Sequence, residues 1–208
     1  MAKALMERNG TGDVFMAPRL YDAMSGVFTG GKRDGLFDRA ASALDIDDPQ
    51  LLVDIGCGTG ALTMALARRF PQSATRGIDP SSEMVGRARH VADRAGLDID
   101  FSVGSAQTLD VDDETASAVS FSLSLHHIPA ADRPLALAEA HRVVVPGGKI
   151  LIVEFDPVGL LGRAFSLHGD DIAAELDIAN ALVDAGFVGV RSERLTRRML
   201  RWWTATRS

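Results

Sequence analysis

The chain has 208 residues, of which 46% are hydrophobic and 24% are charged, so it is long enough to bury a full core within one domain. Its formal net charge of -6 argues against a general binder of nucleic acid, which would need many Lys and Arg side chains to neutralise phosphates. The single cysteine, Cys57, excludes an internal disulfide, and we find neither a secretory leader nor an apolar run long enough to span a bilayer. These features predict a cytoplasmic protein that is not integral to a membrane.

The N-terminal part of the chain has two different patterns. Residues 1–14 are polar and are expected to be loosely ordered. From Pro18 to Leu44, apolar residues recur at helical intervals and are interrupted at Thr29-Gly30-Gly31. This pattern predicts two short helices joined by a glycine turn.

The stretch from Leu51 to Gly60 is an apolar run that ends in an acid and is followed by three glycines at alternate positions. It predicts a buried strand that leads into a tight loop, and the spacing from Ala61 to Arg69 predicts a helix after the loop. Gly56, Gly58 and Gly60 have no Cβ atom, so a ligand can approach the main chain closely. The sequence therefore predicts a cradle for a cofactor at this point.

Strand and helix patterns alternate through the rest of the chain. Further strands are predicted at 74–79, 99–103, 119–125 and 149–155, and helices at 81–95, 133–144 and 171–185. The last two strands, 188–195 and 198–206, have so short a link that only an antiparallel pair is possible. Repeated units of this kind imply a parallel sheet covered on both faces. We therefore predict an α/β fold with a doubly wound, seven-stranded sheet that is mostly parallel and ends in an antiparallel hairpin.

Asp79 ends the second predicted strand, 19 positions beyond Gly60. In an open parallel sheet, ligands bind beyond the carboxyl ends of the strands, and an acid at this distance commonly accepts hydrogen bonds from ribose hydroxyls. The loop and the acid together favour an adenosine cofactor. In the alternative reading, the glycines serve only a tight turn, and Asp79 is an acid that stabilises the start of a helix.

The glycine spacing here is G-x-G-x-G, whereas sites for nicotinamide and flavin dinucleotides normally show G-x-G-x-x-G. The order of this motif, Gly77-Ile78-Asp79 and the run from His141 to Lys149 closely resembles that of the class I methyltransferases, which use S-adenosylmethionine. The resemblance covers about residues 18–206. It implies a Rossmann-like fold and transfer of a methyl group to a small-molecule or lipid-like acceptor.

The resemblance also implies a set of cofactor contacts. Asp54 would lie near the methionine end of the cofactor or anchor the loop, and Asp79 would bind the ribose. The other residues implied to line the cofactor are Tyr21, Gly56, Cys57, Gly58, Gly60, Pro80, Met84, Ser105 and Ala106. Family members commonly have Gly-Asp-Ala where this chain has Gly104-Ser105-Ala106, so Ser105 offers a hydroxyl where the family has a carboxylate.

The acceptor is expected on the side of the sheet where His126 and His127 follow the fourth strand. His127 is the candidate general base for a phenol, a hydroxyl or a carbon acid; alternatively, the pair lines the site, as the Leu-His-His-Ile run does in family members. The resemblance further implies that residues 1–44 form a helical cap over the active site of a methyltransferase domain, residues 45–208. Tyr21 matches a tyrosine of the ubiquinone and menaquinone methyltransferases and of bacterial phospholipid N-methyltransferases.

Two other functions stay open. One is a phosphatidylethanolamine-type N-methyltransferase, and the other, kept open by Ser105, is a non-catalytic regulatory module that binds S-adenosylmethionine. No metal site is predicted, because the His and Asp residues lack the spacing of ligands. Glu139 and Arg142 are expected to hold the fifth-strand region in place. The C-terminal arginines, with Trp202 and Trp203, either contact an anionic membrane surface peripherally or lie in water on an edge hairpin.

Overall fold

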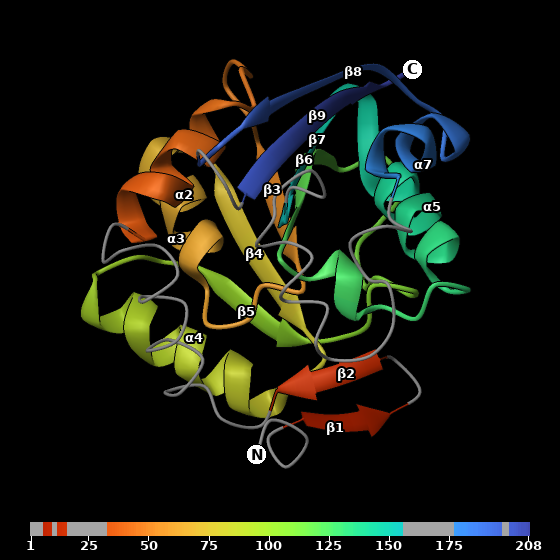
Figure 1. The fold of residues 1–208 in the computed structure, drawn as a ribbon. Coiled ribbons are helices and arrows are strands. Elements are labelled where there is room, and N and C mark those ends of the chain that lie inside the picture. Colours follow the sequence, from red (N-terminus) through yellow and green to blue (C-terminus); the bar gives the residue numbers. More distant parts are fainter. Residues whose placement is uncertain (1–5, 10–11, 16–32, 156–176, 197–199) are drawn as a thin grey trace.

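A computed structural model of the chain describes residues 6–9, 12–15, 33–155, 177–196 and 200–208. Within these residues, one seven-stranded sheet has the strand order β5-β4-β3-β6-β7-β9-β8 (Figure 1). The strands are β3 (Leu51–Ile55), β4 (Ala74–Asp79), β5 (Asp100–Val103), β6 (Ala116–Ser122), β7 (Val144–Phe155), β8 (Phe187–Arg194) and β9 (Leu200–Arg207).

The first five strands of this sheet pair in parallel, as predicted. Strand β9 lies between β7 and β8 and is antiparallel to both. The predicted antiparallel C-terminal hairpin is thus confirmed, and β8 points in the same direction as β7. The strand order reverses at β3, which has β4 on one side and β6 on the other. A reversal of this kind leaves a crevice at the carboxyl ends of the strands.

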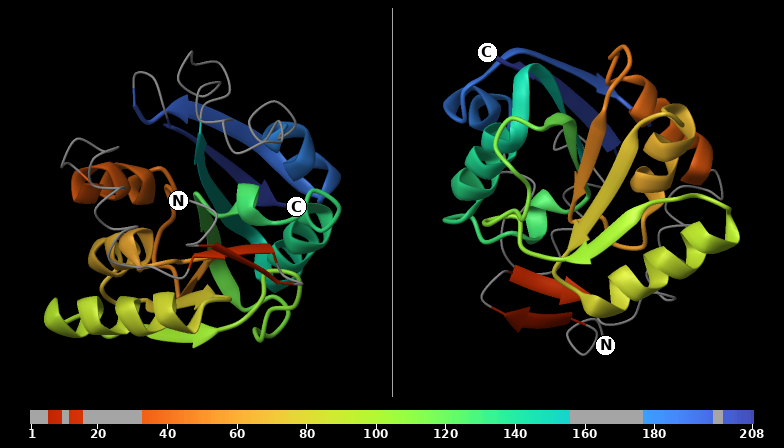
Figure 2. Two further views of the ribbon diagram at one scale, coloured as in Figure 1. Left: turned by 60° about the horizontal axis from the view of Figure 1, so that its bottom comes forward. Right: turned by 180° about the vertical axis from the view of Figure 1, so that it is seen from behind.

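Helices cover both faces of the sheet (Figures 1 and 2). One face carries α2 (Arg33–Ser42), α3 (Ala61–Arg69) and α4 (Ser82–Arg94), and the other carries α5 (Arg133–Val143) and α7 (Ile178–Asp184). Successive residues of a strand point to opposite faces, so each strand contributes to two cores. Val53 and Ile55 belong to the core on the α5 side, whereas Leu52 belongs to the core under α2 and α3. The predicted doubly wound fold is therefore confirmed.

The helix ends follow local signals in the sequence. The Ser81 hydroxyl accepts a hydrogen bond from the Met84 N–H at 3.2 Å and caps α4, and Gly96, with φ +67°, follows its last turn. Helix α5 has a proline in its first turn, where the missing N–H costs nothing. These boundaries lie within a residue or two of those predicted.

Three local predictions were wrong. Residues 6–9 and 12–15 pair as an antiparallel hairpin, β1 (Met6–Asn9) and β2 (Gly12–Phe15), where we expected loose order. Asn9 pairs with Gly12, which leaves two residues between the strands, and a glycine at the first of these positions is a hairpin-turn signal that the polar composition of the segment obscured. The fourth strand was predicted to reach residue 125, but it ends at Ser122 because Leu123 has φ +53°.

The turn Pro146-Gly147-Gly148 was the third wrong prediction. We expected it before the fifth strand, but it lies inside β7. Ala116 pairs with Val144 and Ala118 with Lys149, so β7 holds the turn as an irregularity in its register. A short 3-10 helix, η2 (Leu125–His127), follows β6. The first predicted N-terminal helix, and the start of the helix predicted from residue 171, lie outside the described residues.

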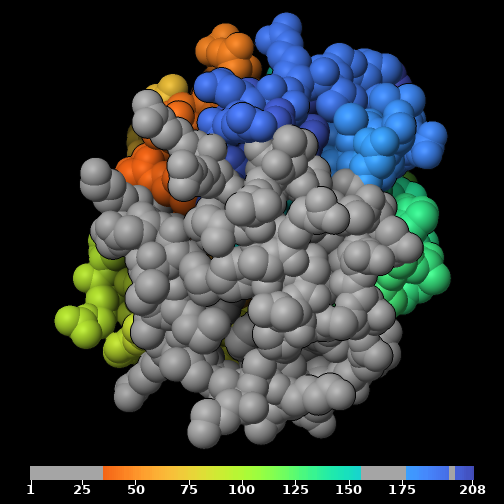
Figure 3. All heavy atoms as spheres, viewed as in Figure 1, coloured from red at the N-terminus to blue at the C-terminus, as the bar shows by residue number. Residues whose placement is uncertain are grey.

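The C-terminal strands lie at the surface of the molecule (Figure 3). Trp203 is buried in the core, whereas Arg191 and Arg194 are exposed, in agreement with the edge-hairpin reading. Arg207 differs, because it donates hydrogen bonds to the carboxylate of Glu114 and the carbonyl of Val144. Among the residues that the structure describes, no helix is long and apolar enough to cross a bilayer.

Candidate cofactor and acceptor site

The glycine loop leaves the carboxyl end of β3 and leads into α3. Gly56, Gly58 and Gly60 have φ values of +68°, +55° and +83°, which other residues rarely adopt. The N–H groups of Gly56 and Cys57 donate to the carbonyl of Ile78 at 2.7 and 3.0 Å, which ties the loop to the neighbouring strand β4. The predicted strand, loop and helix are confirmed.

The three glycines meet different surroundings. A Cβ atom on Gly56 would overlap the side chain of Ser124, and one on Gly60 would lie 3.1 Å from the Phe101 ring. A Cβ atom on Gly58 would meet none of the described atoms within 4 Å. Gly56 and Gly60 are therefore needed for packing, while the described residues leave space beside the main chain of Gly58 where a ligand can approach.

The carboxylate of Asp79 joins the loop to the end of β4. Its Oδ2 accepts from the Gly58 N–H at 2.8 Å, and its Oδ1 accepts from the Ser81 N–H at 2.9 Å. Burial raises the pKa of this carboxyl, and the two backbone hydrogen bonds oppose the increase. Each oxygen keeps a second lone pair. The group can therefore still accept hydrogen bonds from the hydroxyls of a ribose beside Gly58.

Asp54 is fully buried beneath the loop. It accepts hydrogen bonds of 2.6 Å from the hydroxyls of Thr63 on α3 and Ser120 on β6. Burial raises its pKa to about 6, against the lowering effect of these two bonds. Of the two roles implied for Asp54, this geometry matches the anchor of the loop.

Three neighbouring residues that were also predicted to contact the cofactor differ in how far they are buried. The Cys57 side chain packs in a cluster with Phe101, and burial raises the pKa of its thiol well above the usual range, so it is no nucleophile. Met84 is also buried, directly after the Ser81 cap, whereas Pro80 is half-buried between Asp79 and the start of α4.

The loop after β5 lies beside Asp79, because the Gly104 N–H donates to the Asp79 carbonyl at 3.1 Å. The Ser105 hydroxyl donates to Gln107 Oε1 at 2.5 Å and accepts from the Gln107 N–H at 3.2 Å. Ser105 thus uses its hydroxyl within the loop, and Ala106 is partly buried beside it. Gln107 was not predicted from the sequence, because no spacing signal singles it out.

The histidine pair lies in η2, where the chain leaves β6. His126 Nδ1 is 2.8 Å from Oε2 of Glu154, a buried residue near the end of β7. Burial, and secondarily His126, hold the pKa of His127 well below its usual range. Glu154 was not predicted from the sequence, although an acid at the end of an apolar strand was a visible signal. Tyr21 lies outside the described residues.

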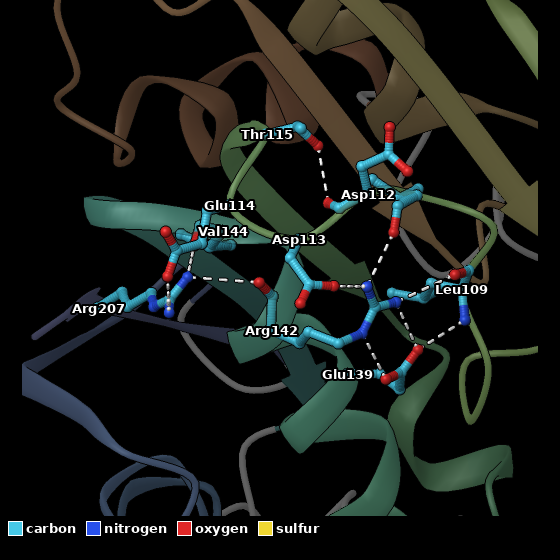
Figure 4. Close-up of polar contacts among 10 residues, drawn as sticks. Leu109, Asp112, Asp113, Glu114, Thr115, Glu139, Arg142, Val144 and Arg207 are labelled. Carbon is cyan, nitrogen blue, oxygen red and sulfur yellow. Dashed lines mark hydrogen bonds and ion pairs between the residues drawn. The ribbon is translucent and has the colours of Figure 1, made fainter.

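Arg142 and Glu139 lie away from this site and join α5 to the β5–β6 connection (Figure 4). The Arg142 guanidinium donates to Glu139 at 2.7 and 2.8 Å, to Asp113 at 2.5 Å, and to the carbonyls of Leu109 and Val111. Their predicted structural role is borne out, but the segment they hold is the β5–β6 connection and not the predicted fifth strand. Among the described residues, no group of three or more His, Cys, Asp or Glu side chains is placed to hold a metal ion.

Comparisons with known proteins agree with this geometry. The family description "Methyltransferase domain" matches residues 52–148. A demethylmenaquinone methyltransferase of Deinococcus radiodurans is 34% identical over 74% of this chain, and one of Thermus thermophilus is 32% identical over 74%. The alignments cover 63% and 69% of these relatives.

One solved structure has the same fold over nearly its whole length. It is a Thermotoga maritima SAM-dependent methyltransferase, described as a possible histamine N-methyltransferase, with a TM-score of 0.71 and 17% identity. The similarity covers 92% of this chain and 97% of the other. From the identity to its relatives, the match of the domain and the shared fold, the chain belongs to the class I S-adenosylmethionine-dependent methyltransferases.

Proposed function

We propose that this chain binds S-adenosylmethionine at the glycine loop and transfers its methyl group to a small-molecule acceptor of the quinol type. The observation that carries the proposal is the bond between the Gly58 N–H and the Asp79 carboxylate. It holds a bare stretch of main chain and a ribose acceptor side by side, at the point where the strand order reverses.

The residues around this bond would have different roles in binding the cofactor. Asp79 would accept hydrogen bonds from the ribose, and the main chain of Gly58 would lie against the cofactor. Asp54, through Thr63 and Ser120, holds the loop in shape from below. Pro80, Met84, Ser105 and Ala106 would border the adenine.

The transfer itself makes modest demands on the protein. A sulfonium methyl group is already activated, so the protein mainly aligns the nucleophile, the methyl carbon and the sulfur, and keeps water out. The acceptor would lie on the side of η2. The hairpin strand β2 packs beside η2, which supports our proposal that residues 1–44 cap the active site.

The acceptor class comes from the relatives. The matched relatives are demethylmenaquinone methyltransferases, and this chain spans about two thirds of their length. A quinol-type acceptor is therefore proposed here. N-methylation of a phospholipid and silent binding of the cofactor are the alternatives that an assay must separate.

Two measurements test the proposal. Calorimetry should show binding of S-adenosylmethionine and none of a nicotinamide dinucleotide, and failure to bind the former would contradict the cofactor assignment. Transfer of a labelled methyl group should then be measured to a reduced prenyl naphthoquinone, to simple phenols and to phosphatidylethanolamine vesicles. Cofactor binding without transfer to any acceptor would favour the regulatory module.

A further inference from the structure

We propose that His126, held by Glu154, is the general base that takes a proton from a hydroxyl of the acceptor. The quinol-type acceptor proposed above must lose a proton from a hydroxyl to become a strong nucleophile. This inference rests on the proposed function and adds the residue pair that takes this proton.

Glu154 is built to hold one imidazole. Its carboxylate is 2.8 Å from His126 Nδ1, and it accepts weaker bonds from the N–H groups of His126 at 3.4 Å and Phe155 at 3.3 Å. The side chain is 3% exposed, and within the described residues its one ionisable partner is His126. A buried carboxylate gains most from a partner that becomes positive. Glu154 is therefore placed to stabilise the positive charge that His126 gains in the proposed step.

The same contact fixes the orientation of the ring. With Nδ1 bonded to Glu154, the remaining nitrogen, Nε2, is on the far side of the imidazole. The contacts of the described residues give Nε2 of His126 no hydrogen-bond partner. The ring packs against His127, with 4.1 Å between centroids, and against Phe155, at 5.5 Å. Nε2 is thus held in place and left available for a hydroxyl.

The pair is connected to the glycine loop by direct contacts. The Ser124 hydroxyl donates to the Ile55 carbonyl at 3.0 Å, and the Ser124 side chain fills the space beside Gly56. His126 is two residues further along the same turn. The imidazole of His126 is therefore placed beside the loop proposed to hold the methyl donor.

His127 is a poorer base at the same turn. Burial and the neighbouring His126 hold its pKa well below the usual range, so it resists protonation. Among the described residues, Arg133 on α5 is a further charged group near the pair, and it donates to the carbonyls of Ile128 at 3.0 Å and His126 at 3.4 Å. Arg133 thus fixes the main chain of the turn, whereas Glu154 contacts the ring itself.

The proposed step moves a proton from the acceptor to His126 and a methyl group from the donor to the acceptor. The acceptor O–H bond breaks, its proton moves to His126 Nε2, and its electron pair stays on the phenolate. The phenolate oxygen, or the ring carbon conjugated to it, forms the new bond to the methyl carbon. The methyl–sulfur bond breaks, and its electrons leave with neutral S-adenosylhomocysteine. Attack through carbon is completed when the ring carbon loses its own proton to water, and the imidazolium returns its proton to solvent.

The test compares the wild type with His126→Gln and Glu154→Gln, using 2-prenyl-1,4-naphthohydroquinone kept reduced under argon. We expect His126→Gln to lower kcat by about 100- to 1000-fold with little change in KM. Glu154→Gln should lower kcat about 10-fold and move the rise of kcat to lower pH, because a neutral amide stabilises the imidazolium less. Affinity for S-adenosylmethionine should stay unchanged in both variants.

Glu114→Gln is the matched control, because this carboxylate also has a cationic partner, Arg207, but lies at the amino end of β6. It should leave kcat and its pH profile as in the wild type. A kcat of His126→Gln within 3-fold of wild type would overturn the inference. Transfer to an amine or phospholipid, and none to the hydroquinone, would overturn it and leave the methyltransferase proposal standing.

A binding measurement tests the pair independently of turnover. With S-adenosylhomocysteine bound, the absorbance of 4-nitrophenol reports how much of it is bound as phenolate. We expect a larger phenolate fraction in the wild type than in His126→Gln at the same pH, and equal fractions would overturn the inference. Failure to bind S-adenosylmethionine at all would instead overturn the proposed function.

Discussion

The two ends of the sheet both carry clusters of charged side chains, but they use them differently. At the amino end, Arg142 donates to two carboxylates and two carbonyls, and Arg207 donates to Glu114 and to main-chain carbonyls (Figure 4). Most of these N–H groups therefore already donate hydrogen bonds to other groups of the protein. At the carboxyl end, the Asp79 oxygens and His126 Nε2 keep capacity for a further partner.

This difference separates structural charge from functional charge. Both clusters contain ionisable groups with shifted pKa values: hydrogen bonds from Arg142 lower that of Glu139, and burial raises that of Asp79. A shifted pKa therefore does not identify the functional end. Two features identify the functional end: side chains that can still form hydrogen bonds, and main chain at Gly58 that the described residues leave open. Four changes test this division between the two ends.

Arg142→Met should have the largest effect, a loss of about 3 kcal/mol in the free energy of unfolding, because several charged hydrogen bonds disappear at once. The loss should be measured by urea denaturation. Arg142→Met that still folds should bind S-adenosylmethionine as the wild type does. The stability of Arg142→Lys should lie between that of the wild type and that of Arg142→Met. Weaker cofactor binding by folded Arg142→Met would contradict the division between the ends.

Asp54→Asn should remove a dependence of stability on pH. The increase of the Asp54 pKa from 3.8 to about 6 corresponds to about 3 kcal/mol at most that the folded state loses on ionisation. Between these values the folded state binds more protons than the unfolded state, so wild-type stability falls as pH rises. The amide nitrogen of Asn cannot accept a hydroxyl donor, so the variant also loses part of the contacts with Thr63 and Ser120 at every pH. The stability of the variant relative to the wild type should therefore rise from about pH 4 to about pH 6 and then stay constant. Denaturation curves at several pH values check this, and a relative stability that falls with rising pH would refute it.

Asp79→Ala should weaken binding of S-adenosylmethionine by about 1 to 3 kcal/mol, the range for a lost charged hydrogen bond. Calorimetry measures the change. Asp79→Asn keeps one carbonyl oxygen and should lose less. An unchanged affinity in Asp79→Ala would show that the ribose assignment is wrong.

Gly58→Ala and Gly147→Ala make the smallest and most closely matched comparison. Both glycines have positive φ, +55° and +79°, and a Cβ on either would meet no atom of the described part of the chain within 4 Å. Each change should cost about 1 kcal/mol of stability through backbone strain. Only Gly58→Ala should also weaken cofactor binding, by about 10-fold, because its methyl group fills the approach to the main chain. Equal binding by the two variants would remove Gly58 from the cradle.

The sequence was sufficient for features that depend on local pattern. The strand from Leu51, the glycine loop and Asp79 were all predicted, because apolar runs, glycines and strand-end acids are visible within short windows. The contact of Glu154 with His126 was not, because it joins residues 28 positions apart through the register of β6 and β7. The end of β6 was missed for a different reason, since nothing about Leu123 indicates its left-handed backbone.

The placement of β9 between β7 and β8 has a consequence for synthesis of the protein on the ribosome. Strand β8 emerges first but bonds only to β9, so it has no partner in the sheet until β9 follows. Until then the apolar edge of β7, including Ile150 and Ile152, stays uncovered and is open to pairing with another nascent chain. Strand β9, which follows β8 in the chain, thus closes the sheet, and the nascent chain is most open to pairing along this edge just before β9 emerges.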